Sequence, residues 1–179
     1  MPRGLIRFHH SGQTHFVTFC CYHRRRLLLG DQRCRVFESA LERVRRSYLL
    51  CIYGYVVMPE HVHLLLSEPR QDTLADALKS LKQGVSRQLL GNTEHFWQKR
   101  YYDFNIRNYE QFREKLRYIH RNPVKRGLCD RPEDWLWSSF RHYATGVEGR
   151  VEIESEWTAR KRERLVGTLG PAVELSHSS

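Results

Sequence analysis

The sequence has no long apolar run. No stretch approaches the roughly 20 consecutive apolar residues that a membrane-spanning helix needs. The first ten residues also lack an apolar core of signal-peptide length. We therefore expect no contact with a membrane and a location in the cytoplasm.

The chain also lacks the cysteine pairs of a C-x-x-C motif. Its five cysteines are odd in number, and two of them are adjacent. This pattern argues against a disulfide framework and against a cysteine zinc site. Free and mostly buried thiols in a reducing compartment fit it better.

Acidic residues are too few to balance the basic ones. Thirty Lys and Arg residues face twenty Asp and Glu residues, for a formal net charge of +10 and an isoelectric point near 9.7. The plain interpretation is a basic, solvated surface. The sharper one is a polyanionic partner, and nucleic acid is the commonest. With 179 residues, 40% of them apolar, the chain can form one folded domain with an appendage.

Two different patterns of apolar residues indicate where strands and helices form. Runs of β-branched, aromatic and apolar residues predict strands at 14–22, 51–58, 61–67 and 102–107, the middle two as an antiparallel hairpin. Apolar residues at spacings of three and four predict helices at 31–50, 72–90 and 109–121. We expect Asp31 and Asp72 to cap the first two helices and Asn122-Pro123 to close the third.

This order predicts an α+β fold with a ferredoxin-like core, a central antiparallel sheet and helices on one face of it. The segment 135–140 is rich in aromatic residues and is expected to pack on the core. The composition becomes charged from about residue 147. We therefore predict a catalytic or binding domain at 1–146 and a charged C-terminal tail at 147–179, containing at most one helix.

His61-Val62-His63 opens the second strand of the hairpin. Side chains two residues apart in a strand point to the same face, so the two imidazoles should lie side by side. With ten histidines in the chain, such a pair also arises by chance. A hydrogen-bonded surface pair is therefore the competing interpretation. The apolar, rigid surroundings favour a metal site.

The third predicted helix carries residues that could complete such a site. Tyr118 and Asn122 are one turn apart, and Lys115 precedes Tyr118 by nearly one turn. A positioned phenol beside cations can attack phosphorus, and an amide oxygen can bind a metal. Taken singly, each residue is more often structural: a tyrosine that packs, and an asparagine in a turn.

Three segments together resemble a known family. Residues 53–66, 118–128 and 135–139 read YGYVVMPEHVHLLL, YIHRNPVKRGL and WLWSS. They resemble the single-tyrosine HUH transposases, and most closely the bacterial REP-associated tyrosine transposases, where REP denotes repetitive extragenic palindromes. The resemblance covers about residues 10–143.

The resemblance implies a fold and a chemistry. It implies the ferredoxin-like core, His61, His63 and Asn122 as ligands of a divalent metal (Mg or Mn), and Tyr118 as the nucleophile. The enzyme would cleave and rejoin single-stranded or hairpin DNA of REP type, through a 5′-phosphotyrosine and a free 3′-OH, as a monomer in a bacterial cytoplasm. Glu60 remains a minor candidate because strand alternation puts it on the opposite face. His120 is left out because it points away from the Tyr118 face.

Contacts to DNA are predicted from exposed basic and aromatic residues. The basic candidates are Arg24, Arg25, Arg26, Lys99, Arg100, Lys115 and Arg121. Unstacked bases could pack on Trp97, Tyr101 or Tyr102.

Two other functions stay open. One is a non-catalytic nucleic-acid-binding module with a ferredoxin-like sheet, although 52–66 lacks the aromatic pattern of RNA-recognition sheets. The other is a metal-dependent phosphoesterase, which would release its products by hydrolysis.

Overall fold

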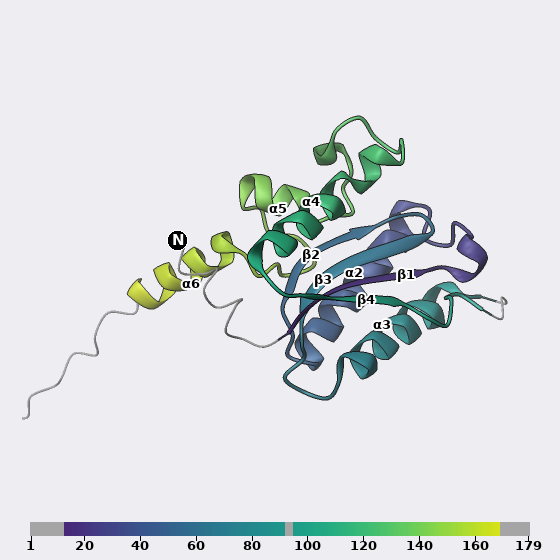
Figure 1. Cartoon of the computed structure of the whole chain (residues 1–179), viewed down its shortest axis with the longest axis horizontal. Coiled ribbons are helices and arrows are strands. Elements are labelled where there is room, and N and C mark those ends of the chain that lie inside the picture. Colours follow the sequence, from purple (N-terminus) through teal and green to yellow (C-terminus); the bar gives the residue numbers. More distant parts are fainter. Residues whose placement is uncertain (1–12, 92–94, 169–179) are drawn as a thin grey trace, which may run out of the picture.

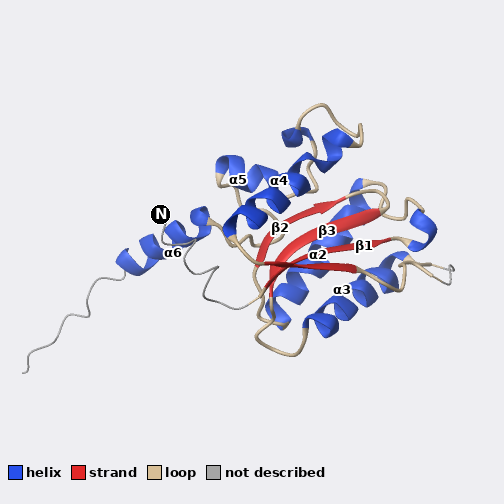
Figure 2. Ribbon diagram, viewed as in Figure 1, coloured by secondary structure: helices blue, strands red, loops and turns tan. Residues whose placement is uncertain are grey.

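A four-stranded antiparallel sheet forms the centre of the computed structural model, which describes residues 13–91 and 95–168. The strand order is β2-β3-β1-β4, as Figures 1 and 2 show. The strands are β1 (Thr14–Cys20), β2 (Ile52–Val57), β3 (His61–Ser67) and β4 (Tyr102–Ile106). This order, with two helical crossovers, is the ferredoxin-like arrangement. The predicted α+β class and the antiparallel sheet are confirmed.

Helices cover both faces of this sheet. The long helices are α2 (Asp31–Ser47), α3 (Leu74–Leu89) and α4 (Tyr109–Lys125). Figure 2 shows α2 and α3 on one face and α4 on the other, over β2 and β3. The prediction that the helices share one face is wrong. β2 is buried throughout, and Leu64 and Leu65 of β3 enter two different core clusters. A strand that alternates apolar and polar residues needs cover on one face only. A strand that is apolar throughout, as β2 is, needs cover on both faces.

Two predicted caps are displaced by one residue. Asp31 is the first residue of α2, and Gly30 takes the cap position. Thr73, and not Asp72, caps α3, because its Oγ1 accepts a hydrogen bond from the Asp76 N–H at 3.1 Å. A side-chain oxygen in that position satisfies one of the free N–H groups of the first turn.

Helix α4 does not end at Asn122-Pro123, as the sequence predicted, but continues to Lys125. A proline in the last turn removes only one backbone hydrogen bond. The helix closes with Gly127 in the left-handed conformation at φ 70°. The Leu128 N–H donates to the Pro123 carbonyl at 2.9 Å, and the Gly127 N–H donates to the Val124 carbonyl at 3.0 Å. This closing motif keeps Asn122 in the helix, buried against the sheet.

The segment 135–139 lies along the outer edge of β2. The Val57 N–H donates to the Trp137 carbonyl at 2.8 Å, and the Ser139 N–H donates to the Tyr55 carbonyl at 3.0 Å. The Trp135 indole N–H also donates to the Val57 carbonyl at 3.0 Å. The predicted packing on the core is present, and the segment also covers an edge that would otherwise be open to association.

Ser139 joins this segment to α4. Its hydroxyl accepts from the Tyr55 N–H at 3.0 Å and lies 2.8 Å from His120 Nε2. Nearby, Gly54 lets the helix approach closely, because a Cβ there would lie 2.6 Å from Leu116 Cδ1. The helix is therefore held at a fixed height above the sheet.

The remaining elements are short turns and a terminal helix. They are the 3-10 turns η1 (Tyr22–Arg24) and η2 (Pro132–Asp134) and the helices α5 (Phe140–Thr145) and α6 (Glu156–Thr168). Between α5 and α6, Val151 and Ile153 are buried in the core, and Glu154 N–H donates to the Ile52 carbonyl at 2.8 Å. Figure 1 shows α6 extending away from the sheet. Of the predicted tail, 169–179 lie outside the described residues, and the domain division at 147 stays a prediction. Within 13–91 and 95–168, no helix has the length and apolarity of a membrane span.

Burial of His120 predicts a loss of stability in acid. Burial lowers the pKa of its imidazole from 6.5 to about 4. As the pH falls below 6.5, the unfolded chain takes up the proton first, so the free energy of unfolding decreases until about pH 4. The full contribution, present above pH 6.5, is on the order of 3 kcal/mol. Urea unfolding at pH 7 and pH 5 should show this loss. The loss of unfolding free energy between pH 7 and pH 5 should be smaller in the His120→Asn variant. An equal loss in the variant and the wild type would show that His120 does not cause it.

Candidate active site between β3 and α4

The two histidines of β3 lie together under α4. His61 and His63 are 1% and 4% exposed, and their Nε2 atoms are 3.0 Å apart. In the antiparallel register, His63 stands opposite Thr18 of β1 and Val56 of β2. The predicted strand alternation therefore brings both imidazoles to one point on the α4 face.

Each imidazole is held by a partner on its other ring nitrogen. His61 Nδ1–H donates to the Glu60 carboxylate at 3.0 Å. His63 Nδ1 lies 2.7 Å from the Thr18 hydroxyl. A carboxylate fixes the tautomer that leaves a lone pair on His61 Nε2, whereas a hydroxyl can donate or accept and so suits either tautomer of His63.

Glu60 does not lie on the opposite face, as strand alternation suggested, but contacts His61. β3 begins at His61, so Glu60 belongs to the turn before it and strand alternation does not govern it. Its carboxylate also lies 3.9 Å from the Arg126 guanidinium. Thr18 was missed as well, because nothing in the sequence reveals the register between β1 and β3.

The surroundings keep both imidazoles neutral. Burial is the main cause that lowers the pKa of His63 to about 3. The adjacent His61 ring lowers it further, as do the positive charges of Arg126, Lys115 and Arg24. Burial also lowers the pKa of His61, against the opposing effect of Glu60. Neutral imidazole is the form that binds metals.

Asn122 brings an amide to the same point from α4. Its Nδ2 lies 3.4 Å from His63 Nε2, and its Oδ1, although buried, has no hydrogen-bond partner among the described residues. A buried acceptor without a partner costs about 1–3 kcal/mol. Rotation of the amide by about half a turn would exchange Nδ2 and this orphaned oxygen, and an oxygen beside two imidazole nitrogens fits the ligand set of a cation.

The 3.0 Å between His61 Nε2 and His63 Nε2 also suits two ligands of one metal ion. Two ligands of an octahedral ion, at about 2.1 Å and at right angles, lie about 3 Å apart. The described residues hold no group of three His, Cys, Asp or Glu side chains suited to a metal. The candidate site here is two imidazoles and an amide, which leaves coordination positions for a substrate.

Tyr118 stands at the open side of this group. It precedes Asn122 by one turn of α4, and its side chain is 41% exposed. The centroid of its ring lies 5.2 Å from that of His63, edge to face. A phenol that is both accessible and next to the histidine pair can reach a phosphate bound there.

Some predicted DNA contacts are close to this group, and others are not. Lys115 and Arg24 lie near enough to lower the pKa of His63, as does Arg126, which the sequence reasoning missed. Lys99 lines a pocket against α3 on the other face of the sheet. The remaining predicted contacts are exposed at the surface: Arg25, Arg26, Arg100 and Arg121.

Trp97 lies on the α2 and α3 face, away from the histidine pair. Its indole N–H donates to the Lys82 carbonyl at 2.9 Å, and its ring packs edge-on against Phe19, with 4.9 Å between centroids. It is half-buried against the core and lines the same pocket as Lys99, and a stacking role for it stays a prediction.

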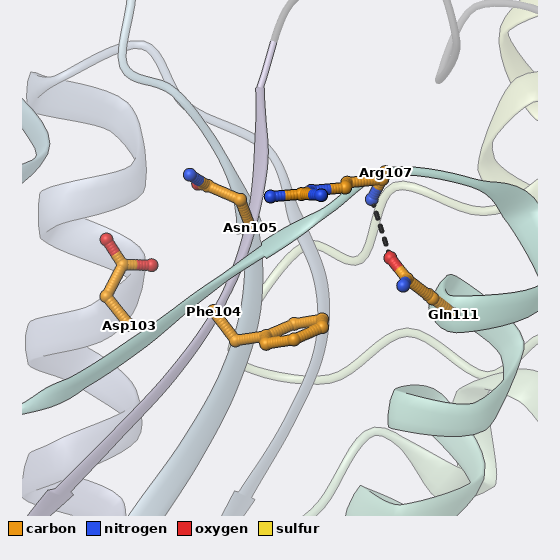
Figure 3. A pocket seen from close by; sticks show the side chains of 5 residues that line it. All are labelled: Asp103, Phe104, Asn105, Arg107 and Gln111. Atoms are coloured by element: carbon orange, nitrogen blue, oxygen red, sulfur yellow. Dashed lines mark hydrogen bonds between the residues drawn. The ribbon is translucent and has the colours of Figure 1, made fainter.

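A shallow pocket of about 360 Å³ lies where β4 meets the start of α4. Figure 3 shows its lining residues, with the Arg107 N–H donating to Gln111 Oε1 at 2.8 Å. Phe104 points toward α4, while Asp103 and Asn105 point away from that helix. The pocket is small and open, and it borders the α4 face on which Tyr118 lies.

Comparisons with known proteins agree on one family. The family model described as "Transposase IS200 like" matches residues 9–122. The chain is 32% identical to the REP-associated tyrosine transposase of Escherichia coli K12 over 144 residues, which cover 79% of this chain and 85% of that protein. It also resembles the solved structure of a REP-associated tyrosine transposase bound to a REP hairpin. That match has a TM-score of 0.66 and 28% identity, and covers 79% of this chain and 86% of the other.

The Thr18 contact predicts an effect on metal affinity. Removing the hydroxyl in Thr18→Val frees the His63 ring, so the affinity for Mn²⁺ should fall by about 10- to 100-fold. Isothermal titration calorimetry measures it directly. Thr14→Val is the matched control, since Thr14 lies on the same face of β1, two pleats from Thr18. Equal affinities in the two variants would refute a role of Thr18 in orienting His63.

Proposed function

The chain belongs to the IS200-like transposase family, and we propose that it cleaves and rejoins single-stranded or hairpin DNA of REP type. The E. coli relative and the hairpin-bound structure support this substrate. The observation that carries the proposal is the meeting of the Asn122 amide, whose Oδ1 is buried without a partner, with the two imidazoles, beside the exposed Tyr118. A structural histidine pair would not need an unsatisfied amide oxygen next to it.

Tyr118 acts as the nucleophile. Its phenolic oxygen attacks the scissile phosphorus, the bond to the 3′ oxygen breaks, and the phenolic proton leaves to solvent while the 3′ oxygen takes up a proton. The products are a 5′-phosphotyrosine and a free 3′-OH. Since no water takes part, the reverse attack by a 3′-OH rejoins the strand.

His61, His63 and Asn122 would hold the divalent cation on which this family generally depends. When bound, Mg²⁺ or Mn²⁺ acts as a Lewis acid that polarises and orients the scissile phosphate. Glu60 and Thr18 keep the two rings aimed at the ion. Asn122 supplies a neutral ligand, so the site does not repel the phosphate as a carboxylate would.

The basic residues guide and hold the DNA. Lys115, Arg24 and Arg126 surround the histidine pair, where they reduce the negative charge that accumulates during attack. Arg25, Arg26, Lys99, Arg100 and Arg121 contact phosphates farther out. In this proposal 1–146 form the catalytic domain of a monomer, and 147–179 are an accessory tail.

The first prediction concerns the covalent intermediate. Wild-type protein incubated with a labelled single-stranded REP hairpin and Mn²⁺ should give an adduct that survives SDS. Tyr118→Phe removes only the hydroxyl, so it should abolish the adduct and leave the affinity for the hairpin unchanged in a gel-shift assay. The exposed Tyr109→Phe variant of the same helix is the control and should behave as wild type.

The same assay separates the alternatives. An adduct that persists in Tyr118→Phe would exclude Tyr118 as the nucleophile. Cleavage without any adduct would identify a hydrolytic phosphoesterase. Binding with neither cleavage nor adduct in the wild type would identify a non-catalytic nucleic-acid-binding module.

A further prediction concerns Asn122. Mn²⁺ should raise the melting temperature of the wild type, and EDTA should abolish both this shift and the adduct. Asn122→Ala should lose most of the Mn²⁺ shift. In EDTA it should lose little stability, because the removed oxygen had no partner. Asn105→Ala, an exposed site on β4, is the control, and an intact Mn²⁺ shift in Asn122→Ala would exclude it as a ligand.

A further inference from the structure

An aromatic strip lies beside Tyr118 on the α4 face of the sheet. It consists of Phe16 of β1 with Tyr102 and Phe104 of the edge strand β4, and we call it the edge platform. Phe16 and Phe104 stand opposite each other in the β1–β4 register, and Tyr102 stands opposite Thr18. Because side chains two residues apart share a face, all three rings are on the side of the histidine pair.

Tyr102 is the accessible part of the platform. Its side chain is 55% exposed, whereas Phe16 is 3% exposed. The Phe16 ring supports both tyrosines edge to face, with centroids 6.5 Å from Tyr102 and 5.9 Å from Tyr118. A large aromatic ring held by a buried neighbour, yet open to solvent, is available to stack on a planar ligand.

A lysine is fixed at the same place. Lys115 Nζ lies 4.8 Å from the Phe16 centroid and 4.7 Å from the Phe104 centroid, so the ammonium is held by two ring faces. Such cation–π contacts position the charge without neutralising it. No carboxylate is paired with Lys115 among the ion pairs of the described residues. An anion is therefore the group that this corner of the surface can accept.

The neighbouring tyrosine does not share this environment. Tyr101, one residue earlier and 37% exposed, lines the pocket against α3 on the opposite side, together with Lys79 and Lys99. The two adjacent tyrosines therefore face different sides of the molecule. Only Tyr102 is connected through Phe16 to Tyr118 and His63.

We propose that Tyr102 is a stacking subsite for a nucleobase close to the scissile phosphate of single-stranded DNA, and that Lys115 contacts the phosphate between that base and Tyr118. An exposed ring for the base, a positioned cation for the phosphate and the proposed nucleophile all border the buried Phe16 ring on one face of the sheet. Stacking reads the π-face of a base and needs no pairing partner, so the subsite selects an unpaired nucleotide over a duplex. This inference rests on the proposed function, since it takes single-stranded DNA as the substrate.

Binding in the absence of cleavage tests the subsite. Oligonucleotides carry the fluorescent base 2-aminopurine at single positions from two nucleotides before to two after the cleavage site, and are titrated with Tyr118→Phe protein in EDTA. Stacking quenches this fluorophore. We expect quenching at one of these positions, its loss on adding Tyr102→Ala, and its retention with Tyr102→Phe. Affinity should fall about tenfold with Tyr102→Ala, and little with the matched control Tyr101→Ala.

Equal quenching and affinity with Tyr102→Ala and Tyr101→Ala, or a larger loss with Tyr101→Ala, would overturn the subsite. Far-ultraviolet circular dichroism and the melting temperature confirm that the variants fold. Because this readout needs neither metal nor cleavage, a failure here leaves the covalent adduct of the wild type intact. Absence of that adduct instead contradicts the catalytic proposal alone.

Discussion

Two neutral imidazoles and an amide side chain are buried at one point between β3 and α4, and the rest of the site depends on that burial. The interior strongly disfavours charge there, as the pKa of His63 at about 3 shows. An unsatisfied Asn122 oxygen in such a place is costly unless something binds it. The protein therefore holds an unsatisfied buried group that a bound ligand would stabilise, a common property of sites kept ready for a ligand.

The scaffold holds α4 over the sheet at a constant height. Ser139 ties His120 of the helix to the Tyr55 backbone, and the segment 135–139 covers the β2 edge at the same time. Gly54 allows the close approach, and the glycine-terminated last turn keeps Asn122 helical despite Pro123. Since α4 carries both Tyr118 and Asn122, these contacts determine where the two side chains stand relative to the histidines. They also explain why the Trp-Leu-Trp-Ser-Ser segment accompanies the histidine pair in the sequence.

The charge distribution favours a polyanion at this place. Lys115, Arg24 and Arg126 lie near the histidine pair. Among the residues that the structure describes, the one carboxylate in contact with the pair is that of Glu60, which pairs with His61 and lies 3.9 Å from Arg126. A neutral histidine pair among cations attracts phosphate from a distance and does not repel it on contact. Attraction to the phosphates of DNA does not by itself distinguish unpaired bases from paired ones. The exposed ring of Tyr102 adds an apolar surface on which an unpaired base can stack.

The sequence by itself determined the order and type of the elements, and with them the α+β sheet, because hydrophobic period is a local property. It also predicted that His61 and His63 share a face, and that Tyr118 and Asn122 are neighbours, since both follow from spacing within one element. Only the tertiary structure decided what depends on register and on which face is covered. Thr18 meets His63 through strand pairing, Glu60 reaches His61 from a turn, and Tyr102 and Trp97 point to opposite faces. Those relations join residues far apart in the chain, and no local pattern records them.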